Sequence, residues 1–262
     1  MKKVITIFLA ALMLLSLFAC GTKTDDDLAY IQKNKKLVIG ITEYEPMNYY
    51  DDSGKLVGFD TEFAEAVCKK LGITPEFIVI NWKTKETELK SKAIDCIWNG
   101  LTVMEDRKKD MAFTTSYLKN EQCVVIRAED ADKYKNAASL SGALIVAEEG
   151  SAGEAAVEND LKDAKYTAVD AQKTALLEVK SKTAEACVID ISMARTMIVA
   201  GSDFSDLLIV EAIDMMDEEY AIGFRLGSSA VEKVNSIIAD FMKDGTIAAI
   251  AEKYDRTDLL IN

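Results

Sequence analysis

The most regular part of this sequence begins with Lys36-Leu37-Val38-Ile39-Gly40-Ile41 and ends with Ile94-Asp95-Cys96-Ile97-Trp98. Both segments are short, apolar and rich in β-branched residues, which predicts strands. Between them, amphipathic runs alternate with one further β-rich run. The predicted elements are strand 36–41, helix 62–71, strand 76–80, helix 85–91 and strand 94–98. Strands that alternate with helices in this way predict an α/β sheet.

The alternation starts again after Tyr117-Leu118-Lys119-Asn120. The predicted strands there are 122–126, 143–147, 166–169 and 186–189, and the predicted helices are 153–161, 172–181 and 192–200. Together they form a second α/β unit of about 95 residues. A strand at 207–210, an apolar segment at 220–224 and two helices at 229–243 and 247–254 complete the chain. The pattern alone does not assign the last two helices to either unit.

The N-terminus has the features of an export signal. Met1-Lys2-Lys3 is positively charged, and residues 4–18 are apolar apart from Thr6 and Ser16. At about 15 residues, the apolar run is shorter than the roughly 20 that a spanning helix needs, so we expect cleavage. Leu17-Phe18-Ala19-Cys20-Gly21 resembles a bacterial lipobox, although Phe18 departs from it. The resemblance implies a lipoprotein signal peptide over residues 1–19 and a lipid on Cys20. An ordinary secretory signal with an incidental cysteine is the alternative.

The mature chain is strongly acidic. Without Lys2 and Lys3 it has 29 basic and 44 acidic residues, a net charge of about −15. Such a charge repels the phosphates of nucleic acids and anionic lipid heads. We therefore expect no nucleic-acid partner and no membrane contact except through the lipid. Residues 20–34, which contain Asp25-Asp26-Asp27, are interpreted as a solvated tether.

Histidine is absent from the sequence. This excludes Ser/His/Asp and Cys/His catalysis and every histidine-ligated metal site. We expect no catalytic residue, no metal and no cofactor. The cysteines after Cys20 are far apart and have apolar neighbours; they are Cys68, Cys96, Cys123 and Cys187. They are interpreted as core residues. Export also permits a disulfide between two of them, and the sequence does not give a pairing.

Several segments together resemble family 3 of the extracellular solute-binding proteins, which serve polar amino acid uptake. In chain order they are Lys36-Leu37-Val38-Ile39-Gly40-Ile41, Tyr44-Glu45-Pro46-Met47, Gly54-Lys55-Leu56-Val57-Gly58-Phe59-Asp60, Asp95-Cys96-Ile97-Trp98-Asn99-Gly100-Leu101-Thr102 with Arg107, Gly150-Ser151-Ala152, Ala186-Cys187-Val188-Ile189-Asp190 and Tyr220-Ala221-Ile222-Gly223-Phe224. The resemblance covers nearly the whole mature chain. It rests on the order and spacing of the segments rather than on any one of them.

The resemblance implies a two-lobed α/β fold like that of periplasmic binding proteins, with two hinge crossings and a ligand cleft between the lobes. Lobe 1 would comprise residues 35–120 and 218–262, and lobe 2 residues 121–217. The crossings would lie near residues 117–121 and 216–220. In this arrangement the C-terminal helices return to lobe 1.

The implied function is that of the substrate-binding component of an ABC importer. We expect a monomer that binds a polar amino acid by lobe closure and delivers it to the importer's membrane subunits. Its lipid would hold it on the extracytoplasmic side of the cell membrane. The protein would not be an enzyme. The alternative is a dehydratase of small carboxylates, because some proteins that resemble this family are dehydratases. Glu148 could then serve as the general acid.

A free amino acid is a zwitterion, so a site that removes its water must offer a cation with N–H donors and an anion. Arg107 follows the strand 94–98, at the sheet end where open α/β folds bind ligands. Its planar fork can donate two parallel hydrogen bonds to a carboxylate. Thr102 could add a hydroxyl. Taken alone, Arg107 fits a solvated charge better. The match to the family at Thr102 and Arg107 instead implies ligand contact.

Two further segments are candidates in lobe 2. Gly150-Ser151-Ala152-Gly153-Glu154 follows a strand and opens a helix, and its S-x-x-E spacing is that of a capping box. The free N–H groups of a helix start favour an anion, although a capped helix without a ligand fits equally. Asp190 ends the strand 186–189. It is the candidate partner of the ligand's ammonium group, or alternatively a cap of the next helix.

By the resemblance, Tyr44 and Trp82 surround the ligand side chain, and Trp82 is expected to be less buried than a core tryptophan. The full expected ligand set is Tyr44, Trp82, Gly100, Thr102, Arg107, Ser151, Ala152 and Asp190. Glu43 and Glu148 lie beside these positions. They could select a cationic or hydrogen-bonding side chain, or they could belong to the solvated surface. The segment between Gly40 and Pro46 is one residue shorter than the family pattern, which leaves the roles of Thr42 and Glu43 open.

Overall fold

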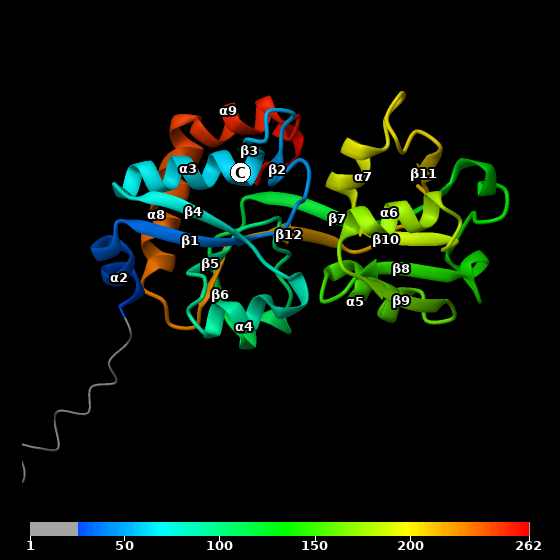
Figure 1. Ribbon diagram of the computed structural model, residues 1–262, viewed down its shortest axis with the longest axis horizontal. Helices are drawn as coiled ribbons and strands as arrows, with labels where there is room; N and C mark the ends of the chain where they lie inside the picture. The colour runs from blue at the N-terminus through cyan, green and yellow to red at the C-terminus, as the bar shows by residue number, and fades with distance from the viewer. Residues whose placement is uncertain (1–25, 262) are drawn as a thin grey trace, which may run out of the picture.

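Two lobes lie side by side in the computed structural model, which describes residues 26–261 (Figure 1). The signal peptide and Cys20 lie outside the described residues. Each lobe is built on its own mixed sheet with helices packed against it. The two-lobed α/β fold is therefore confirmed. Within residues 26–261, no helix combines the length and the apolarity needed to cross a bilayer.

Lobe 1 contains a five-stranded sheet in the order β4, β1, β5, β13, β6. The strands are β4 (Thr74–Val79), β1 (Lys36–Ile41), β5 (Cys96–Ile97), β13 (Gly223–Arg225) and β6 (Met111–Phe113). Strand β1 is parallel to β4 and β5, and β13 is antiparallel to β5 and β6. A hairpin of β2 (Tyr49–Tyr50) and β3 (Leu56–Val57) lies beside it. The carboxyl end of β1 points toward the second lobe (Figure 1), and β5 runs parallel to β1.

The helices of lobe 1 pack on both sides of its sheet. They are α2 (Asp27–Asn34), α3 (Phe59–Leu71), α4 (Lys85–Lys90), α8 (Ala230–Asp244), α9 (Thr246–Lys253) and the short η2 (Trp82–Thr84), η3 (Arg107–Lys109) and η6 (Thr257–Leu259). Figure 1 shows α3 and α9 on one side of the sheet and α4 on the other. Helices α8 and α9 contact α3, so the end of the chain packs on lobe 1.

Lobe 2 contains the strand order β11, β7, β10, β8, β9. The strands are β11 (Leu207–Ile209), β7 (Leu118–Arg127), β10 (Ala186–Asp190), β8 (Leu144–Glu148) and β9 (Lys165–Val169). Strand β8 is parallel to β9 and β10, whereas β7 is antiparallel to β10 and β11. The helices are α5 (Ala152–Asp160), α6 (Gln172–Lys180), α7 (Ile191–Met197) and the short η4 (Ala128–Asp130) and η5 (Ala137–Leu140).

The chain passes between the lobes in two adjacent strands. Strand β12 (Asp217–Tyr220) pairs antiparallel with the start of β7, with Glu218 opposite Asn120 and Tyr220 opposite Leu118. Near the C-terminus, the N–H of Ile261 donates to the carbonyl of Tyr117 at 3.2 Å. A narrow ribbon thus joins the two lobes, which is the arrangement of a hinge.

The expected tether over residues 20–34 is wrong for residues 27–34, which form helix α2. The side chain of Asp26 accepts from the N–H of Ala29 and caps the helix. Ile31 is buried against lobe 1, and Asp27 is buried in an ion pair with Arg225 at 3.0 Å. The acidic run therefore begins a packed helix. The buried apolar residues and the N-cap stabilise this helix more than its acidic charges destabilise it.

The four cysteines of the described chain are buried and their thiols are free. Burial raises the pKa of Cys68 to about 12, and it raises the pKa of Cys96, Cys123 and Cys187 as well. Such thiols are unreactive. The interpretation of these cysteines as core residues is confirmed, and residues 26–261 contain no disulfide.

Candidate functional site

One small cavity between the lobes brings together all eight residues of the expected ligand set. It is lined by Thr42, Tyr44, Trp82, Asn99, Gly100, Thr102, Arg107, Glu148, Ser151, Ala152, Gln172 and Asp190. Its volume is about 10 Å³, which is about the space of one water molecule. The lobes are therefore closed on each other in this structure.

The loops after β1 and β5 form the wall on lobe 1, and they are fixed to each other. The amide of Asn99 accepts from the N–H and the hydroxyl of Thr42, at 3.0 and 2.7 Å, and donates to the carbonyl of Thr42 at 3.0 Å. Thr42 thus has a positioning role in the short segment where the sequence left its role open. The hydroxyl groups of Tyr44 and Tyr220 lie 2.6 Å apart.

Gly100 permits a close approach on this wall. Its φ is +56°, and a Cβ atom built there would lie 2.5 Å from a ring carbon of Tyr44. Its N–H donates to the carboxylate of Asp60 at 2.6 Å, and the hydroxyl of Tyr117 donates to the other carboxylate oxygen at 2.8 Å. Burial raises the pKa of Asp60 to about 7 in spite of these hydrogen bonds. A buried carboxyl of α3 therefore holds the loop that carries Gly100.

Arg107 is a buried cation of the cleft. Its side chain is 7% exposed, which contradicts the solvated charge that its neighbours alone suggest. One guanidinium nitrogen donates to the carbonyl of Thr102 and another crosses the cleft to the carbonyl of Gly150, each at 2.9 Å. Burial lowers the pKa of Arg107. The guanidinium fork therefore bridges the two lobes.

Trp82 and Lys85 complete the wall of lobe 1. Trp82 is 6% exposed, so the expectation of a less buried ring is wrong. The ammonium of Lys85 lies 5.0 Å from the centre of the Trp82 ring and donates to the carbonyls of Trp82 and Gly150 at 3.2 and 2.9 Å. Burial, and then the charge of Arg107, lower the pKa of Lys85 to about 8. The Gly150 carbonyl of lobe 2 is thus held by two cations of lobe 1.

The wall of lobe 2 includes the start of α5. The hydroxyl of Ser151 accepts from the N–H of Glu154 at 3.0 Å, as the capping pattern predicts. The carboxylate of Glu154 accepts from the N–H of Gly150, at 2.6 Å, rather than from that of Ser151. The first N–H groups of α5 therefore begin at the cavity, beside Ala152.

Asp190 is the centre of a hydrogen-bond network. Its carboxylate accepts from Asn120 at 2.6 Å, from Gln122 at 2.9 Å, from the hydroxyl of Tyr220 at 2.9 Å and from the amide of Gln172. It makes no side-chain hydrogen bond to the start of α7, so the cap alternative is wrong. Burial raises the pKa of Asp190 against these hydrogen bonds.

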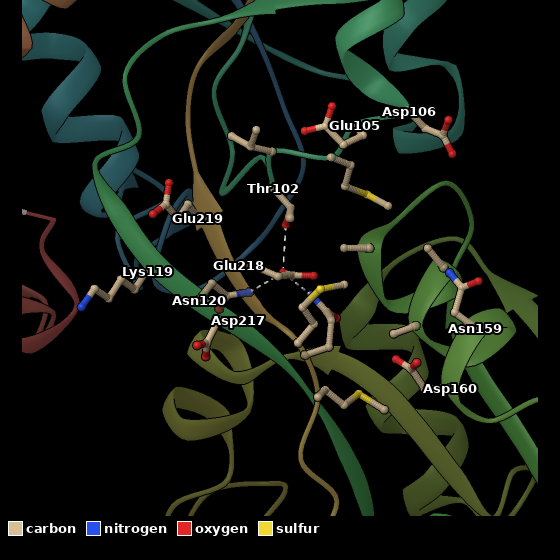
Figure 2. A pocket seen from close by; sticks show the side chains of 18 residues that line it. Thr102, Glu105, Asp106, Lys119, Asn120, Asn159, Asp160, Asp217, Glu218 and Glu219 are labelled. Atoms are coloured by element: carbon tan, nitrogen blue, oxygen red, sulfur yellow. Dashed lines mark hydrogen bonds between the residues drawn. The ribbon is translucent and has the colours of Figure 1, made fainter.

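Glu218, on the hinge strand β12, was not expected at the site. Its carboxylate accepts from Thr102 at 3.1 Å, Asn120 at 3.0 Å and Gln122 at 2.9 Å, as the dashed lines in Figure 2 show. The hydroxyl that we expected to meet a ligand is therefore occupied by Glu218 in this closed form. Burial, and next the charge of Asp190, raise the pKa of Glu218 to about 7.

Glu218 faces a groove of about 960 Å³ that lies next to the cavity and shares Thr102 and Ala152 with it (Figure 2). The groove is bounded by the loop after β5, by the hinge strands and by α5. Its charged residues are Glu105, Asp106, Asp160, Asp217, Glu218, Glu219 and Lys119. This acidic groove is the open side of the closed cleft.

Glu148 ends β8 on the wall of the cavity and is 4% exposed. No hydrogen bond reaches its carboxyl group from any of residues 26–261. Burial, with a smaller contribution from Asp190, raises the pKa of Glu148 to about 8. Glu148 is therefore part of the site rather than of the solvated surface. Its neighbour Glu149 is partly exposed and pairs with Lys83 across the cleft at 2.5 Å.

Comparisons with known proteins identify the family of this chain. The sequence model of the bacterial extracellular solute-binding proteins, family 3, matches residues 37–257. The L-cystine-binding protein TcyJ of Escherichia coli is 26% identical over 231 residues, which cover 87% of this chain and 86% of TcyJ.

Solved structures of amino acid-binding proteins are also similar to this chain. An ABC uptake transporter substrate-binding protein from Streptococcus pneumoniae with bound histidine is 29% identical, with a TM-score of 0.82 over 90% of this chain and 99% of that one. The ancestral amino acid-binding protein AncCDT-1, a precursor of cyclohexadienyl dehydratase, is 27% identical, with a TM-score of 0.80 over 87% of this chain and 98% of that one.

Proposed function

This chain belongs to family 3 of the bacterial extracellular solute-binding proteins, and we propose that it captures a free amino acid as the substrate-binding component of an ABC importer. The relatives named for cystine and histidine binding support this function. The observation that carries it is that two buried groups of opposite charge, Arg107 of lobe 1 and Asp190 of lobe 2, line one cavity.

Each half of the zwitterion has a partner in this scheme. Arg107 binds the ligand carboxylate, assisted by the N–H of Ala152 at the start of α5. The hydroxyl of Thr102 contributes when it exchanges Glu218 for the ligand. Asp190 binds the ammonium group, and the four groups that donate to it keep its carboxylate in place. Tyr44 and Trp82 flank the ligand side chain, and Gly100 lets the Tyr44 ring pack closely against the loop after β5.

Entry of a ligand requires the lobes to separate, because a cavity of about 10 Å³ cannot hold an amino acid. Separation at β7 and β12 breaks the bonds from Arg107 and Lys85 to Gly150 and the pair between Lys83 and Glu149. Donors of Arg107 and Lys85 then become free in the open cleft. A ligand that bridges the lobes favours closure by its higher affinity for the closed form.

The attachment to the membrane rests on sequence alone. Leu17-Phe18-Ala19-Cys20-Gly21 supports a lipid on Cys20, which would hold the protein on the extracytoplasmic side of the membrane. We expect it to act as a monomer. The importer's membrane subunits are its expected partners. The groove of Figure 2 is the face that changes when the lobes move, because it is lined by both lobes and by the hinge.

Dehydratase activity is the second candidate, and one observation favours it. Glu148 is a buried carboxyl group with a pKa of about 8, so it holds a proton at neutral pH, as a general acid must. The similarity to a precursor of cyclohexadienyl dehydratase points the same way. We favour binding without turnover. Incubation with small hydroxylated carboxylates, followed by product analysis, distinguishes the two: product formation would establish the enzyme.

A thermal-shift screen of the purified protein against the common free amino acids tests the proposed function. A ligand at about 100 times its Kd adds roughly 2.7 kcal/mol to the free energy of unfolding, which raises Tm by several degrees. We expect at least one amino acid to produce such a shift and its carboxamide to produce none. A screen in which no amino acid raises Tm would contradict the function.

A further inference from the structure

Glu148 is a buried carboxyl group that the zwitterion scheme does not use. It lines the cavity beside Trp82, Arg107 and Asp190, and it is 4% exposed. Among residues 26–261, no N–H or O–H group donates to its carboxyl oxygens. A carboxylate without partners is costly to bury, so its place on the wall needs a reason.

The cations near Glu148 already have other hydrogen-bond partners. The guanidinium of Arg107 donates to the carbonyls of Thr102 and Gly150. The ammonium of Lys85 donates to the carbonyls of Trp82 and Gly150 and pairs with Glu86 at 3.1 Å. Among the described residues that line the cavity, Arg107 is the one cation, against the carboxyl groups of Glu148 and Asp190.

A zwitterionic ligand does not change the net charge of the cavity, because its own two charges cancel. Its carboxylate is matched by Arg107 and its ammonium by Asp190, so neither charge of the ligand backbone stabilises the ionised form of Glu148. A ligand side chain with one more positive charge supplies that partner. The aromatic rings of Tyr44 and Trp82 on the same cavity suit the stem and the face of such a side chain.

We propose that Glu148 pairs with a positively charged group on the ligand side chain, so that the cleft selects cationic amino acids. This assignment rests on the proposed function and specifies its substrate class. Glu148 is then the residue that determines specificity, whereas Arg107 and Asp190 hold the part common to all amino acids.

Arginine and citrulline are the matched probes. They have the same length and nearly the same shape, but the ureido group of citrulline is neutral. In calorimetric titrations of the purified protein, we expect arginine to bind at least about 30-fold more tightly, because only its guanidinium group can form a buried ion pair with Glu148. This comparison uses the wild type and does not depend on whether a variant folds.

Two variants assign the preference to one carboxyl group. Glu148→Gln keeps the size of the side chain and removes its charge, so we expect the preference for arginine to fall at least about tenfold. Glu149→Gln is the control, since it removes the adjacent carboxylate, which pairs with Lys83 outside the cavity. It should change the binding of both probes by the same factor. Circular dichroism checks that both variants are folded.

Proton release gives a second readout. Glu148 faces Asp190, Lys85, Arg107 and Asp170, and its pKa of about 8 means that it holds a proton at pH 7. Arginine, which requires the ionised form, should release that proton on binding, and citrulline should not. Titrations in buffers of different ionisation enthalpy measure this difference. Glu148→Gln should abolish it.

Each other result counts against the proposal. Equal affinity for arginine and citrulline, or tight binding of only a neutral amino acid, would overturn the selection of cations and leave the proposed function intact. A preference that survives in Glu148→Gln would overturn the role of Glu148. If no free amino acid binds at all, the proposed function fails together with this inference.

Discussion

The carboxyl groups of Asp190 and Glu218 share their hydrogen-bond donors. The amide of Asn120 donates to both, at 2.6 and 3.0 Å, and the amide of Gln122 donates to both at 2.9 Å. One carboxyl group belongs to lobe 2 and the other to the hinge strand β12, so their mutual repulsion acts where the lobes meet. Two carboxyl groups that share donors in this way favour having a proton on one of them.

The first prediction concerns pH and follows from Glu218. Its pKa is about 7 when folded, against an ordinary value of 4.5, so the native state binds more protons than the unfolded state between these values. The free energy of unfolding should therefore be highest near pH 5 and fall as pH rises toward 8. Glu218→Gln should reduce this fall by an amount on the order of 2 kcal/mol.

Urea denaturation of the ligand-free protein from pH 5 to pH 8 measures this effect. Asp60 and Glu148 have raised pKa values too, so the wild type and the variant must be compared. Glu219→Gln is the control, because this neighbouring side chain is exposed. If Glu218→Gln and wild type lose stability equally with rising pH, the two carboxyl groups do not interact as described.

The second prediction concerns Gly100. Gly100→Ala places a Cβ atom 2.5 Å from the Tyr44 ring at a φ of +56°, whereas Gly142→Ala has a φ of +72° and no atom within 4 Å. Both changes carry the backbone cost of about 1 to 2 kcal/mol, and only Gly100→Ala adds a steric cost of about 1 to 3 kcal/mol. Urea denaturation should therefore show a larger loss for Gly100→Ala. Equal losses in the free energy of unfolding would mean that the Tyr44 ring moves aside without a steric penalty.

The third prediction concerns the anchor. Wild-type protein should sediment with membranes, and Cys20→Ser should be released, because stable attachment needs the acyl chains that the cysteine carries. Fractionation followed by immunoblotting measures the distribution. Cys68→Ser, at a buried thiol, is the control and should remain with the membrane. Membrane attachment of a processed Cys20→Ser protein would exclude the lipoprotein assignment.

The regular elements were predictable because their apolar periodicity is local. The strand predicted at 36–41 is β1, and the helix predicted at 172–181 differs from α6 by one residue. The two-residue strands β2 and β3 and the strand β6 were not predicted, since such short segments have no periodicity and depend on their partners. Helix α2 was missed because its acidic start was interpreted as a charge run.

The candidate site was predictable only in part. The resemblance to the family supplied Arg107 and Asp190, but not the groups that hold them. Asn120 and Gln122 alternate on a buried strand, a signal that could have marked a polar face pointing at the cleft. The position of Glu218 depends on the pairing of β12 with β7, which joins residues about a hundred positions apart and leaves no local pattern.

The central claim is that Arg107 and Asp190 each hold one half of an amino acid. Arg107→Ala leaves the ligand carboxylate without its buried partner, at a cost of about 3 to 5 kcal/mol, or roughly a hundredfold to several thousandfold in affinity. Asp190→Asn should cost a similar factor through the ammonium group. Lys108→Ala is the control, because Lys108 is exposed and pairs with Glu105 outside the cavity.

The most direct measurement is a calorimetric titration of three ligands: the amino acid selected by the screen, its carboxamide and its analogue without the α-amino group. Each ligand is titrated into wild type, Arg107→Ala and Asp190→Asn. These are double-mutant cycles with atoms of the ligand as one partner. We predict that the carboxamide weakens binding strongly in wild type but little in Arg107→Ala, and that loss of the α-amino group does the same with Asp190→Asn. If both ligand changes cost the same in wild type and variants, Arg107 and Asp190 do not hold the zwitterion.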